Sequence, residues 1–540
     1  MKIVLIQPPI RDFYDTDIRL QPLGLCMLKA VVKKYMPDVE VIVKDYHQGR
    51  GRRTIPYPVE FSYLREYYQY HDKGPFSMFH HYYHFGASFH DIAEDVVRER
   101  PDLVGISSLF SPYYREALAC AQAIKGHIDV PVIMGGPHVS AMPREMLKDP
   151  NVDYIIRGEG ERPLVELLGC MQSGGDLRNV PNLGFKQGDE LVLNPIGRAY
   201  DPDDLPWPDF SDLHLNRYRL NGSPLCFIMT SRGCPHRCTF CSVHLTFGDG
   251  FRTRPVDDII MEIKKRYDDG YRVFDFEDDN LSYNRGYFKG LLETLIELFP
   301  NGDIHLVAMN GISYMSLDRE LLELMKRAGF SGLNLSLVSS NAATLKSCKR
   351  PHTLNKYIET VETASRLGLD IVTYQILGLP NETQDEMIET MAFLAGLPAL
   401  IGVSIFYLTP GSPIAEGLPA MTESDIMKAR STSMAIVTDQ FERDDLYTLF
   451  ITARIINFLK GINSIIEDID LAAALEIAEG AGRRGALGSD ILKRLLNERR
   501  LYAMTGDGMK IIHRFKADLF FMLWAKLPFI FTCNGARINL

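Results

Sequence analysis

Residues 225–244, LCFIMTSRGCPHRCTFCSVH, join an apolar strand directly to a loop that holds three cysteines. Cys234, Cys238 and Cys241 stand in the order C-x3-C-x2-C immediately after the strand. In α/β barrels the reacting groups lie at the carboxyl ends of the strands. The loop therefore lies where a barrel would place its chemistry.

Three thiolates in one loop allow several interpretations. His244, three residues past Cys241, could complete a Cys3His zinc site. Alternatively, three thiolates could hold three irons of a 4Fe–4S cluster, whose fourth iron would stay open because such clusters normally take four cysteines. Three unligated cysteines are a poor third choice, since one third of the chain's nine cysteines would share eight residues.

Strand and helix patterns alternate on the C-terminal side of this loop. Together with the strand at 225–231, five further apolar runs predict six βα units: residues 272–278, 304–310, 332–338, 370–377 and 403–410. This pattern predicts a partial (β/α)6 barrel of the TIM type over residues 223–420. Residues 196–222 are rich in Pro and Asp and predict a linker, and residues 421–540 predict a mostly helical region.

The N-terminal part, residues 1–195, shows the same alternation of strand and helix patterns. Five nearly continuous apolar runs alternate with amphipathic helices, which predicts a doubly wound, Rossmann-like α/β domain. Ligands of such sheets bind beyond the carboxyl ends of the strands. Small or polar residues gather at three of these ends: Ser107, Ser108, Gly135, Gly136, Gly158 and Glu159. No G-x-G-x-x-G follows the first strand, so a dinucleotide is disfavoured.

Composition narrows the class of protein. The 540 residues carry a net charge of −10, which argues against non-specific electrostatic binding to nucleic acid or anionic membranes. No apolar run is long and uninterrupted enough for a membrane span, and the start MKIVLIQPPI is unlike a signal peptide. A reduced, cytoplasmic protein is expected. Five histidines in the aromatic stretch at 67–91 lack clear ligand spacing, so this stretch is interpreted as a lid or packing segment.

The segment CPHRCTFC resembles the CxxxCxφC signature of radical S-adenosylmethionine (SAM) enzymes, with Phe240 at the aromatic position. The segments VFDFEDDNLSYN, QILGLPNET and LTPGSP are similar to later strand ends of that family. DLVGISS, VIMGGPHVSA and DYIIRGEGE resemble the cobalamin-binding domain that precedes the radical domain in one large subclass. The resemblance covers roughly residues 1–420, and it favours the cluster over zinc.

The resemblance implies three cofactors: a 4Fe–4S cluster, SAM and cobalamin. Cys234, Cys238 and Cys241 would ligate the cluster, and the SAM contacts would be Phe240, Asp278, Asp279, Ser339 and Gly378. Cobalamin would lie on the strand-end residues of the first domain, Ser107, Ser108, Gly135, Gly136, Gly158 and Glu159.

Two departures from the family pattern stand out. Val338 replaces a glutamate that is common at the end of the fourth strand, which puts the ribose contact there in doubt. The loop after the first strand has no histidine, and Asp45-Tyr46-His47 imitates only half of the D-x-H-x-x-G motif. We therefore expect cobalamin without a histidine below the cobalt, and His138 in a packing or tail-contact role.

The resemblance implies methylation of an unactivated carbon by way of a 5′-deoxyadenosyl radical and methylcobalamin. The substrate would be a small molecule or peptide, and the electron would come from an external donor such as flavodoxin or ferredoxin. A cobalamin-dependent rearrangement, ring closure or ring contraction is the alternative. Methylthiolation of tRNA or protein, and a zinc-binding interaction protein, are more distant ones.

Overall fold

The computed structural model describes residues 1–16, 20–351 and 353–540, which divide into two compact units. The N-terminal unit comprises residues 1–56, 82–279 and 408–429. The C-terminal unit comprises residues 57–81, 280–407 and 430–540.

A seven-stranded sheet forms the larger part of the N-terminal unit. Its order is β10-β9-β8-β7-β6-β1-β3, and the five strands predicted from the sequence pair in parallel. β9 and β10 add an antiparallel hairpin that the apolar pattern missed, because these strands are partly exposed. The strands are β1 (Lys2–Gln7), β3 (Glu40–Asp45), β6 (Leu103–Ser107), β7 (Val132–Gly135), β8 (Tyr154–Ile156), β9 (Leu183–Gln187) and β10 (Glu190–Leu193).

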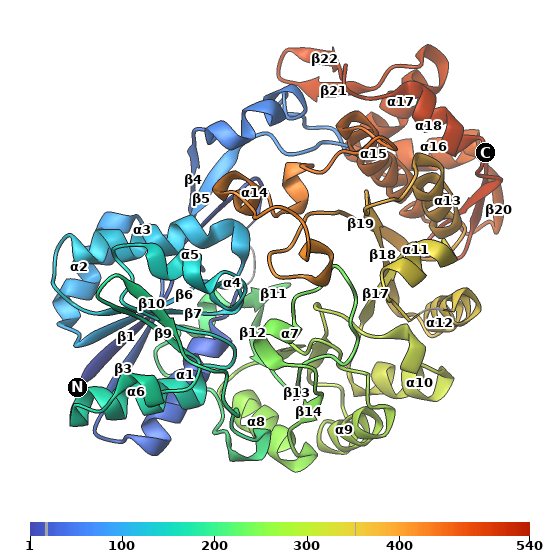
Figure 1. The fold of residues 1–540 in the computed structure, drawn as a ribbon. Helices are drawn as coiled ribbons and strands as arrows, with labels where there is room; N and C mark the ends of the chain where they lie inside the picture. Colours follow the sequence, from blue (N-terminus) through green and yellow to red (C-terminus); the bar gives the residue numbers. More distant parts are fainter. Residues whose placement is uncertain (17–19, 352) are drawn as a thin grey trace. The chain divides into compact units, whose positions relative to one another are not determined.

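Helices cover both faces of this sheet, as a doubly wound fold requires (Figure 1). α1 (Leu23–Tyr35) and α6 (Glu161–Ser173) lie together on one face, and α2 (Phe89–Glu99) and α3 (Tyr114–Lys125) lie together on the other. This double cover explains why the central strands are almost continuously apolar. The short helices α4 (Pro137–Ala141) and α5 (Pro143–Lys148) follow β7.

The first part of the predicted barrel belongs to the same unit. β12 (Ser223–Ile228) pairs in parallel with β15 (Val273–Phe276) and antiparallel with β11 (Arg219–Leu220). Between β12 and β15 lie the short hairpin β13 (Ser231–Arg232) and β14 (Arg252–Thr253) and the helices α7 (His244–Phe247) and α8 (Val256–Asp268). A small antiparallel sheet, β2-β5-β4, also belongs here, with strands Ile10–Asp12, Tyr82–Phe85 and Arg52–Ile55.

The C-terminal unit holds the other predicted βα elements. Helices flank the strands of a parallel sheet, β17-β18-β19, in the sequence. Together with β12, β15 and β16, these strands account for all six that were predicted for the radical domain. The elements are α9 (Arg285–Leu298), β16 (His305–Val307), α10 (Arg319–Ala328), β17 (Gly332–Val338), α11 (Ala342–Ser347), α12 (Leu354–Arg366), β18 (Asp370–Leu377), α13 (Gln384–Ala395) and β19 (Leu400–Ile405).

The tail is mostly helical, as predicted, but it also contains five short strands. These strands have three or four residues each, too few for a visible period. The helices are α14 (Glu423–Met427), α15 (Arg443–Lys460), α16 (Leu471–Gly480), α17 (Arg483–Glu498) and α18 (Ala517–Trp524). The strands are β20 (Asp468–Asp470), β21 (Tyr502–Thr505), β22 (Gly508–Ile511), β23 (Phe529–Phe531) and β24 (Arg537–Asn539).

The aromatic insertion, residues 57–81, packs against this tail within the C-terminal unit. The Tyr63 hydroxyl donates to the Ser433 carbonyl at 2.7 Å, and the Tyr68 hydroxyl donates to the Thr432 carbonyl at 2.7 Å. Tyr67 donates to a carboxylate oxygen of Asp444 on α15. The contacts of Tyr67 and Tyr68 favour the packing interpretation for residues 67–81 of the predicted stretch 67–91. Residues 82–91 instead belong to the N-terminal unit, as β5 and the start of α2.

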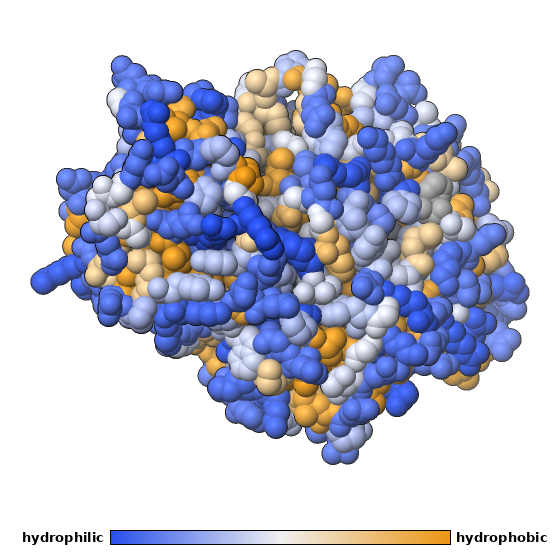
Figure 2. Space-filling view, turned by 60° about the horizontal axis from the view of Figure 1, so that its bottom comes forward, coloured by the Kyte–Doolittle hydropathy of each residue, from blue (hydrophilic) through white to orange (hydrophobic). Residues whose placement is uncertain are grey.

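None of the helices in the described residues has the length and apolar character needed to cross a bilayer. The face drawn in Figure 2 is covered largely by hydrophilic residues, with hydrophobic residues in scattered groups among them.

Candidate functional site

The strand end before the cysteine loop is fixed by Asp278, which follows β15. Its buried carboxylate accepts hydrogen bonds from the Thr230 backbone N–H (3.2 Å), the Thr230 hydroxyl (2.7 Å) and the Ser231 hydroxyl. Burial raises the pKa of Asp278. Asp278 therefore holds the start of the cysteine loop, and its predicted contact with SAM stays a prediction.

Its neighbour Asp279 faces the cysteine loop itself. It accepts the Gly233 N–H at 3.1 Å, and burial raises its pKa to about 6. Gly233 has φ of +83°, and a Cβ there would lie 2.3 Å from the Gly250 carbonyl oxygen, so only glycine fits. Of the two aspartates, Asp279 remains the candidate partner for the SAM ammonium.

The three cysteines form a tight loop whose thiols affect one another. The Cys241 N–H donates to the Cys238 carbonyl at 3.1 Å. Burial is the main cause that raises the pKa of the Cys241 thiol to about 11; Cys238, Asp279 and Cys234 add to the rise, and a hydrogen bond from the Val243 backbone opposes it. A positively charged iron centre would offset the cost of ionising this buried thiol, because cluster ligation takes cysteine as the thiolate.

Among the described residues, no three His, Cys, Asp or Glu side chains already form a ready-made single-ion site. The fit to a cluster rests on the donor set, three thiols in one loop, because iron–sulfur clusters are held by cysteine thiolates. Phe240, at the aromatic position of the loop, is half-buried.

A second segment of the predicted barrel packs on the cysteine loop. The Ile414 N–H donates to the Thr239 carbonyl at 2.8 Å. A Cβ at Gly411, whose φ is +71°, would lie 2.4 Å from Leu245 Cδ1 on α7. The LTPGSP segment thus contacts the cysteine loop and the helix that follows it.

The predicted cobalamin edge of the seven-stranded sheet is built mainly from backbone. Ser107 ends β6, and the Ser108 N–H donates to the Gly135 carbonyl at 2.8 Å. Among the described residues, the buried Ser108 hydroxyl has no hydrogen-bond partner. A Cβ at Gly135 would meet only the Ile156 carbonyl, at 3.9 Å. An unsatisfied hydroxyl beside an open stretch of backbone fits a polar ligand such as cobalamin.

The two histidines that might have reached cobalt are both buried. His138 is buried, its Nδ1 lies 3.0 Å from the Ser111 hydroxyl, and burial lowers its pKa to about 4. His47 lies in a turn closed by Asp45, whose carboxylate accepts the backbone N–H of His47 at 2.8 Å. The Ser111 contact of His138 agrees with its predicted packing role, and cobalamin without a histidine ligand stays a prediction.

Glu159, predicted as a cobalamin contact, has other partners in the structure. Its carboxylate is ion-paired with Arg232, two residues before Cys234, and with Arg252 on β14. Glu161 pairs with the same Arg232. The sequence analysis did not predict Glu161, Arg232 or Arg252 as part of the site. The charged residues within the segments GEGE and SRGC could have indicated an ion pair there.

Two predicted SAM contacts lie in the C-terminal unit. Ser339 is buried, and its hydroxyl lies 3.4 Å from that of Thr390. Gly378 has φ of +80°, and its N–H donates to Glu382 at 2.9 Å. Val338, where relatives often have glutamate, is buried with φ of +79°, a strained conformation for a β-branched residue.

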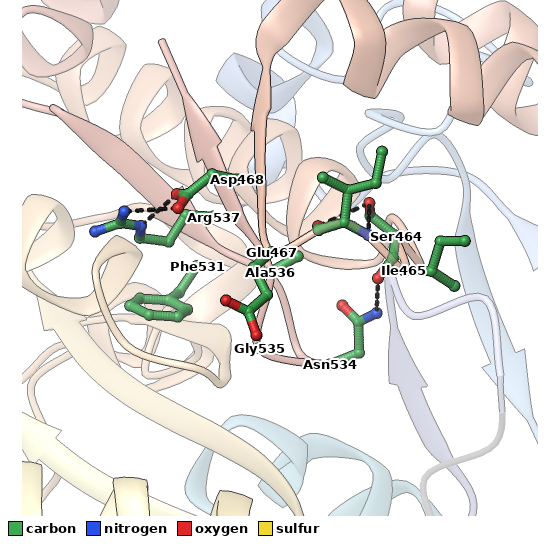
Figure 3. A pocket seen from close by; sticks show the side chains of 10 residues that line it. Ser464, Ile465, Glu467, Asp468, Phe531, Asn534, Gly535, Ala536 and Arg537 are labelled. Atoms are coloured by element: carbon green, nitrogen blue, oxygen red, sulfur yellow. Dashed lines mark hydrogen bonds and ion pairs between the residues drawn. The ribbon is translucent and has the colours of Figure 1, made fainter.

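A pocket of roughly 390 Å³ lies in the tail, between the loop before β20 and the loop before β24 (Figure 3). Arg537 pairs with Asp468 through two contacts of 2.6 and 2.9 Å, and Asn534 donates to the Ser464 carbonyl at 2.9 Å. Since these polar groups bind one another, the pocket offers no evident cofactor position.

Comparison with known families decides between the cluster and zinc. The profile of the radical SAM superfamily matches residues 228–394, and that of the B12 binding domain matches residues 78–168. The chain is a cobalamin-binding radical SAM protein. The predicted fold class, enzyme class and three cofactors are thereby confirmed for this radical SAM protein, and the zinc-binding interaction protein is set aside.

Three curated relatives show the range of reactions near this radical SAM protein. It is 30% identical to the uncharacterized methyltransferase PH0819 of Pyrococcus horikoshii, over 57% of the chain and 66% of the relative. It is 24% identical to cytidylyl-2-hydroxyethylphosphonate methyltransferase of Streptomyces wedmorensis, over 70% and 73%. It is 27% identical to anaerobic magnesium-protoporphyrin IX monomethyl ester cyclase of Cereibacter sphaeroides, over 62% and 56%.

A solved structure shares the fold. The radical SAM methyltransferase TsrM of Kitasatospora setae, with cobalamin and a 4Fe–4S cluster bound, has a TM-score of 0.58 and 19% identity. The match covers 76% of this chain and 73% of TsrM.

Proposed function

We propose that this protein methylates an unactivated carbon of a small molecule or peptide, as a cobalamin-dependent radical SAM enzyme. One observation carries the proposal: the cysteine loop and the cobalamin-type sheet edge are parts of one compact unit. The names of two relatives and of TsrM, which describe methyltransferases, support it.

The residues of the chain have separate tasks in this proposal. Cys234, Cys238 and Cys241 hold the cluster, and Asp279 holds the SAM ammonium near it. Ser108 and the backbone at Gly135 bind cobalamin. When bound, the cluster would supply the electron that cleaves SAM, and cobalamin would supply the methyl group. An external donor of the flavodoxin or ferredoxin type would reduce the cluster, and the protein would act in the reducing cytoplasm.

Reconstitution under anaerobic conditions tests the cluster assignment. The wild type should bind four irons and four sulfides, and the triple change of Cys234, Cys238 and Cys241 to Ala should abolish both without loss of far-UV circular dichroism. The control is a Cys170→Ala/Cys533→Ala variant, which removes two thiols outside the loop and should keep the cluster. Stoichiometric zinc in anaerobically purified wild type would contradict the assignment.

The products of SAM distinguish methylation from ring closure, which the cyclase relative favours. Methyl transfer should release S-adenosylhomocysteine together with 5′-deoxyadenosine when reduced enzyme is incubated with its substrate. Formation of 5′-deoxyadenosine alone, alongside a turned-over substrate, would favour ring closure or rearrangement.

A further inference from the structure

Arg232 connects the cysteine loop to the predicted cobalamin-binding domain. Its guanidinium is buried, with 7% of the side chain exposed. One terminal nitrogen lies 2.5 Å from Glu159 Oε2, and the other lies 2.6 Å from Glu161 Oε1. The second oxygen of Glu159 binds Arg252.

This network is balanced, because two carboxylates face two guanidinium groups. Glu159 and Glu161 are nearly as buried as Arg232, with 8% and 11% of their side chains exposed. Burial of such groups costs free energy, and removal of one partner leaves the others uncompensated. The network therefore differs from an exposed ion pair, which typically contributes about 0–1 kcal/mol.

The ends of the network touch both proposed cofactor sites. Glu159 follows Gly158, whose N–H donates to the Ser140 hydroxyl at 2.8 Å and whose Cβ, if present, would lie 3.4 Å from the Thr246 carbonyl on α7. At the other end, Arg232 precedes Gly233, which is fixed by Asp279 and by its close approach to Gly250. A short chain of buried contacts therefore joins the turn at Gly158 to Gly233.

We propose that Arg232, Glu159 and Glu161 are positioning residues that couple cobalamin binding to the presence of the iron–sulfur cluster. The inference rests on the proposed function for the identity of the two cofactors. The three side chains act through the backbone of Gly158 and Gly233. Coupling through a fixed network is reciprocal, so the cluster should strengthen cobalamin binding by the same factor that cobalamin stabilises the cluster.

The test is the Kd of cob(II)alamin, measured by anaerobic equilibrium dialysis with and without the cluster. Wild type with the cluster should bind roughly five-fold or more tightly than the cluster-free triple cysteine variant. Arg232→Lys, which keeps the charge but loses the two-pronged contact, and Glu161→Gln should each bring this ratio towards one.

The matched control is Arg237→Gln in the same loop. Arg237 pairs with Asp249, but both side chains are about half exposed, so the ratio should stay at the wild-type value. Equal Kd values for wild type with and without the cluster would overturn the coupling, as would an unchanged ratio in Arg232→Lys. If wild type took up no cluster or no cobalamin, the proposed function itself would fail, which is a separate result.

Discussion

At the scale of single residues, the adjacent aspartates after β15 have different tasks. Asp278→Ala removes three hydrogen bonds to Thr230 and Ser231 in a buried place, so the free energy of unfolding should fall by on the order of 3 kcal/mol. Cluster content should fall with it. Thermal unfolding and iron analysis measure the two effects.

Asp279→Asn should behave differently. The amide oxygen can still accept the Gly233 N–H, so the unfolding temperature should stay close to that of wild type. Loss of the negative charge should weaken SAM binding roughly ten-fold or more at pH 8, measured by calorimetry on the reconstituted protein. If Asp278→Ala alone weakened SAM binding and Asp279→Asn did not, the two roles would have to be exchanged.

Two adjacent glycines at the predicted cobalamin edge should also separate an effect on stability from an effect on ligand binding. A Cβ at Gly136 would lie 2.7 Å from the Ser108 carbonyl oxygen, and its φ is +114°, so Gly136→Ala should destabilise the fold. Gly135 has room for a side chain, so Gly135→Leu should fold and instead obstruct the ligand. Cobalamin occupancy should fall by most of its value in Gly135→Leu while iron content is unchanged. Full occupancy in that variant would place the cobalamin elsewhere.

At the scale of secondary structure elements, the sequence predicted the strands that are buried on both faces. β1, β6 and β7 are short apolar runs, and all three pair in parallel, as the alternating pattern predicts for a doubly wound sheet. The hairpin β9–β10 and the tail strands are short or half-exposed, so their residues carry little period. In the site, the cysteines follow a motif, but ion pairs such as Arg232–Glu159 join residues 73 positions apart, and no spacing rule reaches across that distance.

The loop between β18 and α13 should make stability depend on pH. Buried Glu382 accepts the N–H groups of Gly378 (2.9 Å) and Leu379 (3.1 Å), and among the described residues its second oxygen has no partner. Burial raises its pKa to about 8 from the ordinary 4.5. The protonated form therefore stabilises the fold below pH 4.5, and this stabilisation is lost as pH rises through about 8.

Urea unfolding followed between pH 5 and pH 8.5 should show this loss in wild type. Each unit of pKa shift corresponds to about 1.4 kcal/mol, so the change is large enough to measure. Glu382→Gln should flatten this part of the curve. Glu389→Gln, an exposed change on the neighbouring α13, is the control and should leave the pH dependence intact. An identical slope in Glu382→Gln and wild type would show that Glu382 is ionised throughout.

At the scale of the whole molecule, the chain leaves its first unit and returns to it. β4 and β5 form an antiparallel pair in the N-terminal unit, and their ends Ile55 and Tyr82 are directly opposite each other. The insertion between them, residues 57–81, belongs to the C-terminal unit. The hairpin can therefore be closed by a short turn without a change in its pairing.

Replacing residues 56–81 by Asn-Gly should affect the C-terminal unit while the N-terminal one stays intact. The insertion gives tyrosine hydrogen bonds to residues 432 and 433 and to Asp444, and their loss should increase amide hydrogen exchange in α15. Exchange in β1 and β6, and cobalamin binding, should match wild type. Tyr63→Phe/Tyr68→Phe, which keeps both rings and removes two of the hydroxyl contacts, should give the same pattern to a smaller extent. If exchange rose in β1 and β6 and not in α15, the insertion would instead be a structural part of the cobalamin-binding domain.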